Sequence, residues 1–216
     1  MEDRKDVLFH EAANIFPLLD GEEFDRLVAD IRQHGLREDI HLFDEKVIDG
    51  RNRYRACLQA GVERRYTEIE TDDPVAYVLS LNLHRRHLTP SQASMVAARA
   101  KGIYEEQAKQ RQQIRKGHQA GATPVNLPEL SKGDARDKAG KAVGVSGRSV
   151  DHASRVLEKG TPELVKAVDE GRMAVSTAAK VAEQPQELQK KIVESGRVDE
   201  AVRALVSFKI RRRPPW

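Results

Sequence analysis

Residues 47–57 read VIDGRNRYRAC, and the interpretation of the first third of the chain depends on this stretch. Its apolar start is typical of a strand end, Gly50 permits a close approach of the backbone, and the basic residues that follow begin a helix. Amide N–H groups at a helix start, together with guanidinium groups, can bind an anion. The stretch therefore fits a phosphate loop or an ordinary solvated helix start, and its spacing alone slightly favours the second.

The segments around this stretch predict a small sheet-and-helix domain. Residues 21–35 carry apolar side chains at helical spacing, and Gly35 is a suitable C-cap. Residues 39–50 alternate apolar and polar residues around a two-residue turn, which indicates a short hairpin. Two further elements complete this domain: a helix over residues 53–61 and a strand over residues 63–70.

The chain changes character after residue 73 and becomes largely helical. We expect helices on both sides of a break at residues 88–90, where Thr89 is a good N-cap and Pro90 suits the first helical turn. These signals predict the following organisation: an N-terminal domain over 1–88, a connecting helix over 89–115, a flexible linker over 116–133, a helical DNA-binding domain over 134–206 and a basic tail over 207–216.

Residues 135–160, ARDKAGKAVGVSGRSVDHASRVLEKG, show the clearest local pattern. Small residues in the first half allow two helices to pack closely, and Gly144 suits the turn between them. The second helix, about Gly147 to Glu158, exposes polar side chains and fits a helix that enters the major groove of DNA. The alternative is a plain helical hairpin with solvated faces. The candidate DNA-binding residues are Ser146, Arg148, Ser149, Asp151, His152 and Arg155.

A second group of polar residues lies in SLNLHRRHLTPSQA, residues 80–93, where Asn82, Arg85 and Arg86 precede the helix break. His84 and His87 are interleaved with them, but no cysteine lies nearby, so we interpret both histidines as partly exposed polar residues rather than zinc ligands.

Composition limits the class of protein. The 216 residues are 39% hydrophobic and 33% charged, and no run approaches the roughly 20 apolar residues of a membrane span. One cysteine, Cys57, cannot form an internal disulfide, which fits a reducing cytosol. The formal net charge of +3 is too small to identify a nucleic-acid partner by itself, so the placement of charge matters more.

The order of these segments resembles the ParB family. The resemblance is carried by residues 19–40, 47–61 and 81–94 and then by the helix-turn-helix pattern, and it extends from about Ile15 to Val193. It implies an α+β chain, in which a small mixed α/β ParB/sulfiredoxin-like N-terminal domain is followed by an all-α helix-turn-helix domain.

The resemblance also implies ligands and partners. Many ParB proteins bind CTP with a divalent cation and recognise a specific, usually palindromic, DNA site as dimers. It therefore implies CTP and Mg²⁺ as cofactors, and double-stranded DNA, a second copy of the chain and a partner ATPase as partners. The expected setting is plasmid, phage or chromosome partition in the cytoplasm, on a nucleoid or plasmid, away from membranes. Gly50 and Arg53 match the family's phosphate loop, and Asn82 and Arg85 match its second segment. The expected nucleotide-binding residues are Gly50, Arg51, Asn52, Arg53, Asn82, Arg85 and Arg86, with Asn82 also as the metal ligand.

The chain departs from the family motifs within both segments. The loop is commonly Gly-Glu-Arg-Arg, whereas Arg51 and Asn52 replace the glutamate and the first arginine here. The second segment commonly begins Glu-Asn, and Leu81 replaces that glutamate, which is implicated in hydrolysis. The resemblance therefore implies nucleotide binding without efficient hydrolysis, and we assign no catalytic residue.

Two further departures concern the first helix and the chain's end. Glu38 and Asp39 occupy positions where the family commonly has Gln-Pro, and only about 20 residues follow Val193. So short a segment does not provide the separate dimerisation domain of full partition proteins, so we do not expect a permanent clamp.

Two other functions remain as alternatives. The first is a helix-turn-helix transcriptional regulator that does not use nucleotide and keeps its N-terminal domain for protein contacts. The second is a ParB-like nuclease, which would need clustered carboxylates to hold metal; Asp49, Asp72 and Asp73 do not form a convincing set. Sulfiredoxin-like redox chemistry is not expected, because Cys57 lies within a predicted helix rather than in the loop.

Overall fold

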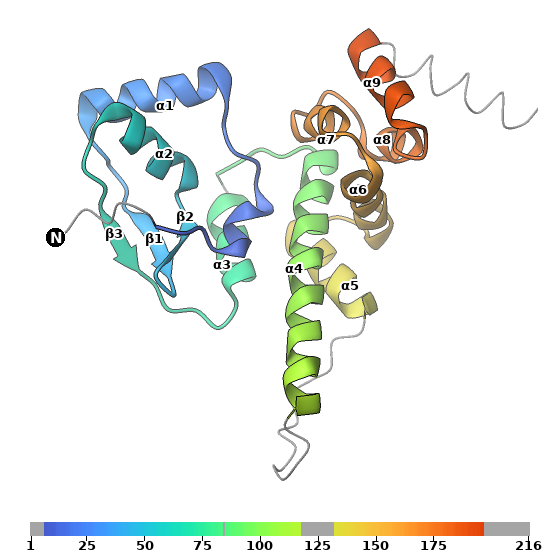
Figure 1. Cartoon of the computed structure of the whole chain (residues 1–216), viewed down its shortest axis with the longest axis horizontal. Helices are drawn as coiled ribbons and strands as arrows, with labels where there is room; N and C mark the ends of the chain where they lie inside the picture. The colour runs from blue at the N-terminus through green and yellow to red at the C-terminus, as the bar shows by residue number, and fades with distance from the viewer. Residues whose placement is uncertain (1–6, 84, 118–131, 197–216) are drawn as a thin grey trace, which may run out of the picture. The chain divides into compact units, whose positions relative to one another are not determined.

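The computed structural model describes residues 7–83, 85–117 and 132–196 (Figure 1). The chain divides into two compact units, Met1–Arg85 and Arg86–Trp216, which we call the first and second units. The sequence placed its domain boundary after residue 88. Residues 118–131 of the predicted linker, residues 197–206 of the predicted DNA-binding domain and the predicted tail lie outside the described residues.

The first unit contains a three-stranded sheet in the order β2-β1-β3. Strands β1 (Ile40–Phe43) and β2 (Lys46–Asp49) form the predicted antiparallel hairpin, and β3 (Tyr66–Glu68) returns parallel to β1. Asp44 and Glu45 both have positive φ angles, 48° and 61°, as a two-residue hairpin turn of this kind requires. The hairpin prediction is confirmed.

Four helical elements surround the sheet: the 3₁₀ helix η1 (Glu11–Ile15), α1 (Gly21–His34), α2 (Arg51–Ala60) and α3 (Pro74–Leu83). One hydrophobic core joins α1, α2 and the sheet, and it includes Phe24, Ile40, Val47 and Cys57. Because successive strand residues point to opposite faces, Ile48 lies on the other face from Val47; η1 and α3 contact β2. The sheet is thus fixed from both faces, and so is the junction between β2 and α2.

Helix α3 ends at Leu83 rather than at the break predicted near residue 88. Two side chains bind the carbonyl groups of its last turn: Asn82 Nδ2 donates to the oxygen of Val78 at 3.0 Å, and Arg85 Nε donates to that of Leu81 at 2.7 Å. The Leu81 carbonyl lies among the last four of α3, which have no intrahelical partner, so Arg85 replaces the missing N–H donor there. The early end of α3 brings both side chains toward the sheet.

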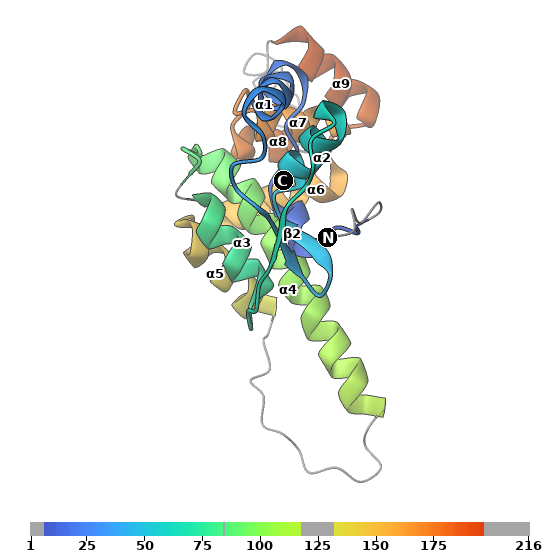
Figure 2. The same cartoon turned by 90° about the vertical axis from the view of Figure 1, so that its left-hand side faces the viewer.

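The second unit is helical throughout its described residues (Figure 2). The long helix α4 packs against α5, α6, α7 and α8. Thr89 precedes α4 as predicted, and its Oγ1 accepts from Gln92 N at 3.3 Å. The helices are α4 (Pro90–Gly117), α5 (Lys132–Val143), α6 (Gly147–Lys159), α7 (Pro162–Asp169), α8 (Val175–Val181) and α9 (Gln186–Ser195).

A small three-stranded sheet with helices, followed by a helical unit, makes the chain α+β, as expected. None of the helices in the described part of the chain is long and apolar enough to cross a membrane.

Candidate functional site

The junction between β2 and α2 is built around Gly50. This residue precedes α2 with φ 94° and ψ 21°, a left-handed conformation that favours glycine. A Cβ atom placed there would lie 3.0 Å from Arg53 Nη2 and 3.1 Å from Arg53 Nε. The absence of a side chain at Gly50 therefore allows the guanidinium of Arg53 to lie against the backbone at the start of the helix.

Arg53 binds acidic and carbonyl oxygens from two parts of the first unit, the connection between α1 and β1 and the end of β2. Its Nη2 donates to Asp49 Oδ2 and to the carbonyl oxygen of Asp39, both at 3.0 Å, and its Nη1 donates to Glu38 Oε2 at 2.9 Å. Only 17% of the Arg53 side chain is exposed, against 65% for Glu38. The partners of Nη2 are thus a backbone oxygen and a buried carboxylate, whereas the partner of Nη1 is a mostly exposed side chain.

Two residues from the end of α3 complete the group. Asn82 Nδ2 donates to Asp49 Oδ1 at 3.0 Å, and Arg85 Nη2 lies 3.5 Å from Asp49 Oδ2. The structure therefore gathers Gly50 and Arg53 of the loop with Asn82 and Arg85 of the second segment, although these pairs lie about 30 residues apart. We call Asp49, Arg53, Asn82 and Arg85 the Asp49 cluster.

The Asp49 carboxyl is ionised despite being buried. Burial acts to raise its pKa, but the hydrogen bond from Asn82 and the charges of Arg53 and Arg85 outweigh burial, so the pKa lies below its ordinary value. Asp49 thus places a fixed negative charge next to the guanidiniums of Arg53 and Arg85 and orients them.

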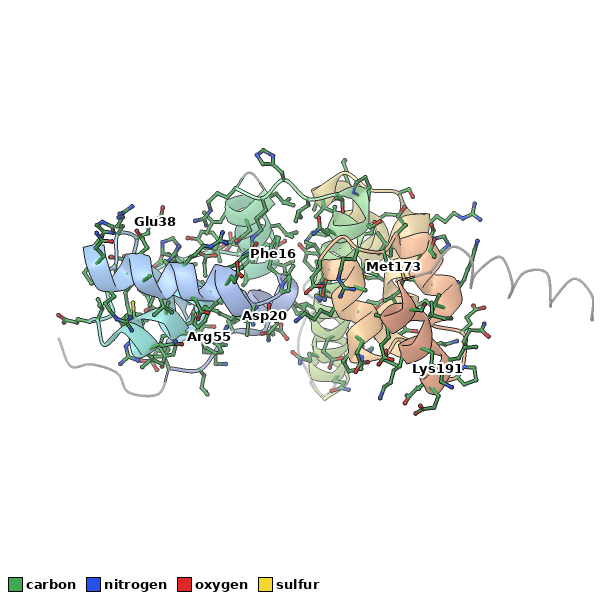
Figure 3. The ribbon with its side chains drawn as sticks, turned by 90° about the horizontal axis from the view of Figure 1, so that it is seen from above. Phe16, Asp20, Glu38, Arg55, Met173 and Lys191 are labelled. Atoms are coloured by element: carbon green, nitrogen blue, oxygen red, sulfur yellow. The ribbon has the colours of Figure 1, made fainter. Side chains whose placement is uncertain are left out.

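Glu38 and Asp49 are the residues of this site that the sequence did not assign to it. Glu38 Oε2 lies 3.3 Å from Arg85 Nη1 as well as 2.9 Å from Arg53 Nη1. Figure 3 shows Glu38 beyond one end of α1, with Phe16 and Asp20 at the other end. The sequence offered one signal for each: Asp49 directly precedes the loop glycine, and Glu38 stands where the family commonly has an uncharged glutamine.

Arg51 and Asn52, both predicted to contact nucleotide, instead bind the segment before α1. Arg51 Nη2 donates to the carbonyl oxygen of Phe16 at 2.6 Å, and Asn52 Oδ1 accepts from Leu19 N at 3.0 Å. Arg55 adds a hydrogen bond to the Leu19 carbonyl oxygen at 3.1 Å. These side chains fasten the entry of α1 to α2, and they leave Arg53 as the loop arginine that joins the Asp49 cluster.

The remaining predicted nucleotide contact, Arg86, begins the second unit, where its carbonyl oxygen accepts from Leu88 N at 2.9 Å.

The Asp49 cluster fits a phosphate ligand. The Nε of Arg53 is buried and has no hydrogen-bond partner among the described residues. The N-terminal amides of α2, a ten-residue helix, start next to it, and helix N-termini attract anions. A phosphate site combines such parts: two guanidiniums, the start of a helix, and a glycine at a position where a side chain would contact Arg53.

A divalent cation has fewer ligands to use here. Both hydrogen bonds of the Asn82 side chain come from Nδ2, so its Oδ1 is the oxygen that faces a cation. No group of three or more His, Cys, Asp or Glu side chains in the described ranges could hold a metal ion. Mg²⁺ commonly takes only one or two protein oxygens and completes its shell with water and substrate phosphates, which is the mode that Asn82 fits.

The predicted DNA-binding residues lie on α6 and at its start. Gly144, with φ 73°, forms the turn after α5, and Val145 N donates to the Gly140 carbonyl oxygen at 2.9 Å. A Cβ at Gly140 would lie 2.9 Å from the oxygen of Val145, so this glycine permits the tight approach of turn and helix. Val150 and Ala153 are buried, and Val143 and Val145 are half-buried.

The polar residues of α6 are in different environments. Ser146 is the N-cap, since its Oγ accepts from Ser149 N at 3.2 Å. Asp151 pairs with Arg136 of α5 at 3.4 Å and Arg155 with Glu183 at 3.6 Å, while His152 is half-buried. Arg148, in the first turn, is exposed and forms no ion pair with a carboxylate of the described residues.

No family model matches the chain, and no curated protein matches it. The solved structures to which the chain is similar include ParB proteins. The chain is similar to a Pnob8-like ParB-N domain, with 14% identity over 81% of this chain and 75% of that one and a TM-score of 0.47. It is also similar to the C-terminally truncated chromosome-partitioning protein ParB from Caulobacter crescentus. The structure of that protein in complex with the centromeric parS site shows 17% identity over 88% of this chain and 90% of that one, with a TM-score of 0.38. The structure of that protein in complex with CTP-gamma-S shows 16% identity over 83% of this chain and 88% of that one, with a TM-score of 0.28.

Proposed function

We propose that the chain is a ParB-like DNA-binding protein of partition type whose first unit binds CTP. The observation that carries this proposal is the convergence of Gly50, Arg53, Asn82 and Arg85 around Asp49 at the start of α2. The motif resemblance singles out the same four residues from two separate segments, and the fold brings them within contact of one another.

Each residue has a distinct part in this proposal. Arg53 and Arg85 neutralise phosphate oxygens, and the α2 amides after Gly50 donate to them. Asn82 Oδ1 contributes one ligand to a Mg²⁺ ion that is otherwise bound by water and phosphate. Arg51 and Asn52 act indirectly, because they hold α2 to the segment before α1 and so fix the position of the helix start.

Calorimetric titration of the full chain with CTP in Mg²⁺ buffer tests this site. We expect saturable binding by the wild type and at least about a tenfold loss of affinity in Arg85→Ala, since a charged hydrogen bond contributes about 1.5–3 kcal/mol. Arg85 is 45% exposed, so its removal spares the core. The matched control is Arg26→Ala, which removes an arginine from an exposed ion pair on α1. A wild-type protein that gives no heat with CTP contradicts the proposal.

We also propose that α5, the turn at Gly144 and α6 form a helix-turn-helix that binds a palindromic DNA site as a homodimer. The close approach of the turn to Gly140 of α5 supports this proposal. So does the exposed Arg148 in the first turn of α6, because the first residues of a recognition helix meet base edges. Arg155, Asp151 and His152 lie further along the same helix. In this proposal the protein acts in the cytoplasm, on nucleoid or plasmid DNA, with a partner ATPase.

Selection of sequences from a random double-stranded DNA library tests the DNA-binding proposal. We expect the full chain to enrich a palindromic sequence and Arg148→Ala to bind it about tenfold or more weakly, because a specific base contact contributes about 1–3 kcal/mol. Arg172→Ala is the control, since Arg172 is an exposed arginine paired with Glu170. Failure to enrich any sequence contradicts this half of the proposal. DNA enrichment without CTP binding favours the nucleotide-independent regulator instead.

A further inference from the structure

Glu38 already occupies the place where an anion would bind the two arginines of the Asp49 cluster. Its single oxygen Oε2 lies 2.9 Å from Arg53 Nη1 and 3.3 Å from Arg85 Nη1. A bridging carboxylate oxygen of this kind has the charge and the contacts of a phosphate oxygen held between two guanidiniums. The side chain of Glu38 thus stands in for ligand.

The charges of the group agree with this reading. Arg53 and Arg85 contribute two positive charges, and the carboxylates of Asp49 and Glu38 contribute two negative ones. Asp49 is buried and is held by Asn82, so it stays in place. When Glu38 leaves, the remaining group carries one net positive charge and a free Nη1 on Arg53, which favours an incoming phosphate.

Glu38 is also able to leave at low cost. Its side chain is 65% exposed, and the residue lies in the connection between α1 and β1 rather than inside either element. The neighbouring Asp39 is fixed independently, since its carboxylate accepts from Arg65 Nε at 2.9 Å and from Thr67 Oγ1 at 3.0 Å. Rotation of the Glu38 side chain therefore leaves the start of β1 in place.

We infer that Glu38 is a tethered competitor of the anionic ligand: it closes the Asp49 cluster when no ligand is bound, and phosphate must displace it. This inference rests on the proposed nucleotide site and adds to it a residue that lowers its affinity. The consequence is a site tuned to release ligand more readily than its two arginines alone would allow.

Replacement of Glu38 by glutamine tests the inference, because Glu38→Gln keeps the size of the side chain and removes its charge. Calorimetry of the full chain with CTP, and separately with inorganic tripolyphosphate, should show about three- to tenfold tighter binding by this variant than by the wild type, since displacement of one exposed ion-pair partner is worth a modest amount. The matched control is Glu22→Gln, which removes the carboxylate of the exposed Arg26 pair on α1 and should leave both affinities unchanged.

The possible outcomes distinguish a failure of the inference about Glu38 from a failure of the proposed nucleotide binding. Wild-type binding with equal or weaker binding by Glu38→Gln overturns the inference and leaves the nucleotide site standing. Equal gains in Glu38→Gln and Glu22→Gln also overturn it, because they show an effect of net charge alone. Binding of CTP or tripolyphosphate by Glu38→Gln when the wild type gives no heat shows that Glu38 blocks the site, which supports the inference and overturns the proposal that the natural chain binds CTP. No heat from either protein with either ligand overturns both.

Discussion

Asp49 in the first unit and Gln189 in the second are both buried polar residues with several hydrogen bonds, and they differ in the kind of partner they bind. Asp49 is held by side chains, and its cluster reaches solvent through Arg85, which is 45% exposed. Gln189 is 1% exposed and binds only backbone groups in the described part of the unit.

The contacts of Gln189 join α9 to the ends of three other helices. Its Oε1 accepts from Thr161 N at 2.9 Å, at the start of α7. Its Nε2 lies 2.9–3.2 Å from three carbonyl oxygens, those of Lys159 at the end of α6 and of Ala182 and Gln184 after α8. These groups lie at chain reversals and have no helical partner, so one side chain in α9 satisfies polar groups from three neighbouring helices.

This difference in partners means that the Asp49 cluster can exchange a partner, whereas Gln189 cannot. Backbone groups at fixed helix ends leave Gln189 no alternative arrangement, so its role is stability. The guanidiniums of the Asp49 cluster pair with Glu38, which is 65% exposed and which we infer to be displaced by ligand, so we propose that the role of this cluster is binding. A buried polar side chain therefore indicates function when its partners are exchangeable side chains, and indicates architecture when they are backbone.

The largest effect should come from Gln189→Leu, which keeps the volume but leaves buried backbone groups without partners. We expect a loss of about 3 kcal/mol or more in the unfolding free energy of the second unit, since each buried unsatisfied group costs about 1–3 kcal/mol. Urea unfolding followed by circular dichroism, with hydrogen exchange at α7 and α9, measures this loss. Gln186→Leu, on the exposed side of the same helix, should change stability by less than about 0.5 kcal/mol. Similar effects of the two variants would show that Gln189 is not the organising residue.

An intermediate effect should come from Gly50→Ala, and Gly61→Ala provides a matched control. Both glycines have positive φ, but a Cβ meets Arg53 at 3.0 Å at the first and nothing within 4 Å at the second. We expect about 1 kcal/mol of destabilisation in Gly61→Ala from the backbone alone and about 2 kcal/mol in Gly50→Ala. Only Gly50→Ala should also weaken CTP binding in calorimetry. Equal losses of stability would mean that Arg53 moves aside without cost and that the Asp49 cluster is loosely built.

Local signals in the sequence predicted the elements of the first unit. The alternation in residues 39–50 and the glycines at 35 and 61 identified the hairpin and the ends of α1 and α2, because such signals act over a few residues. The end of α3 was misplaced, since it depends on Asn82 and Arg85 binding their own helix.

The site was less predictable, because its contacts join residues far apart in the chain. The family motif identified Arg53 and Arg85. Their pairing with Glu38 depends on the path of the connection between α1 and β1, which no local pattern predicts. Likewise, Arg51 and Asn52 carry the chemistry of a phosphate loop and yet bind the segment before α1, which no local pattern indicates. Gln189 lies in the polar sequence QELQKKIVES, where nothing marks that one glutamine as buried.

The smallest effect concerns pH, and it sharpens the contrast between a unit held by ionisable groups and one held by a neutral amide. His10 caps η1, since its Nδ1 accepts from Ala12 N at 3.1 Å. Burial, with a smaller contribution from Lys46, holds the pKa of His10 below its ordinary value of 6.5, against the opposing charges of Glu11 and Asp44. The unfolded chain takes up the proton more readily, so the stability contributed by His10 is fully present above about pH 6.5 and is lost as pH falls toward the folded pKa.

Hydrogen exchange in the first unit, compared between pH 7.5 and 5.5 after correction for the intrinsic exchange rate, measures this loss. We expect it to be below about 1 kcal/mol, because His10 is only partly buried. His10→Asn keeps an acceptor at the cap and removes the titration, so the pH dependence near η1 should shrink in this variant while that of α7 and α9 stays unchanged. The wild type and His10→Asn are compared at each pH, so the titration of other histidines cancels. An unchanged pH dependence near η1 in His10→Asn would show that the titration of His10 does not govern the stability of this helix.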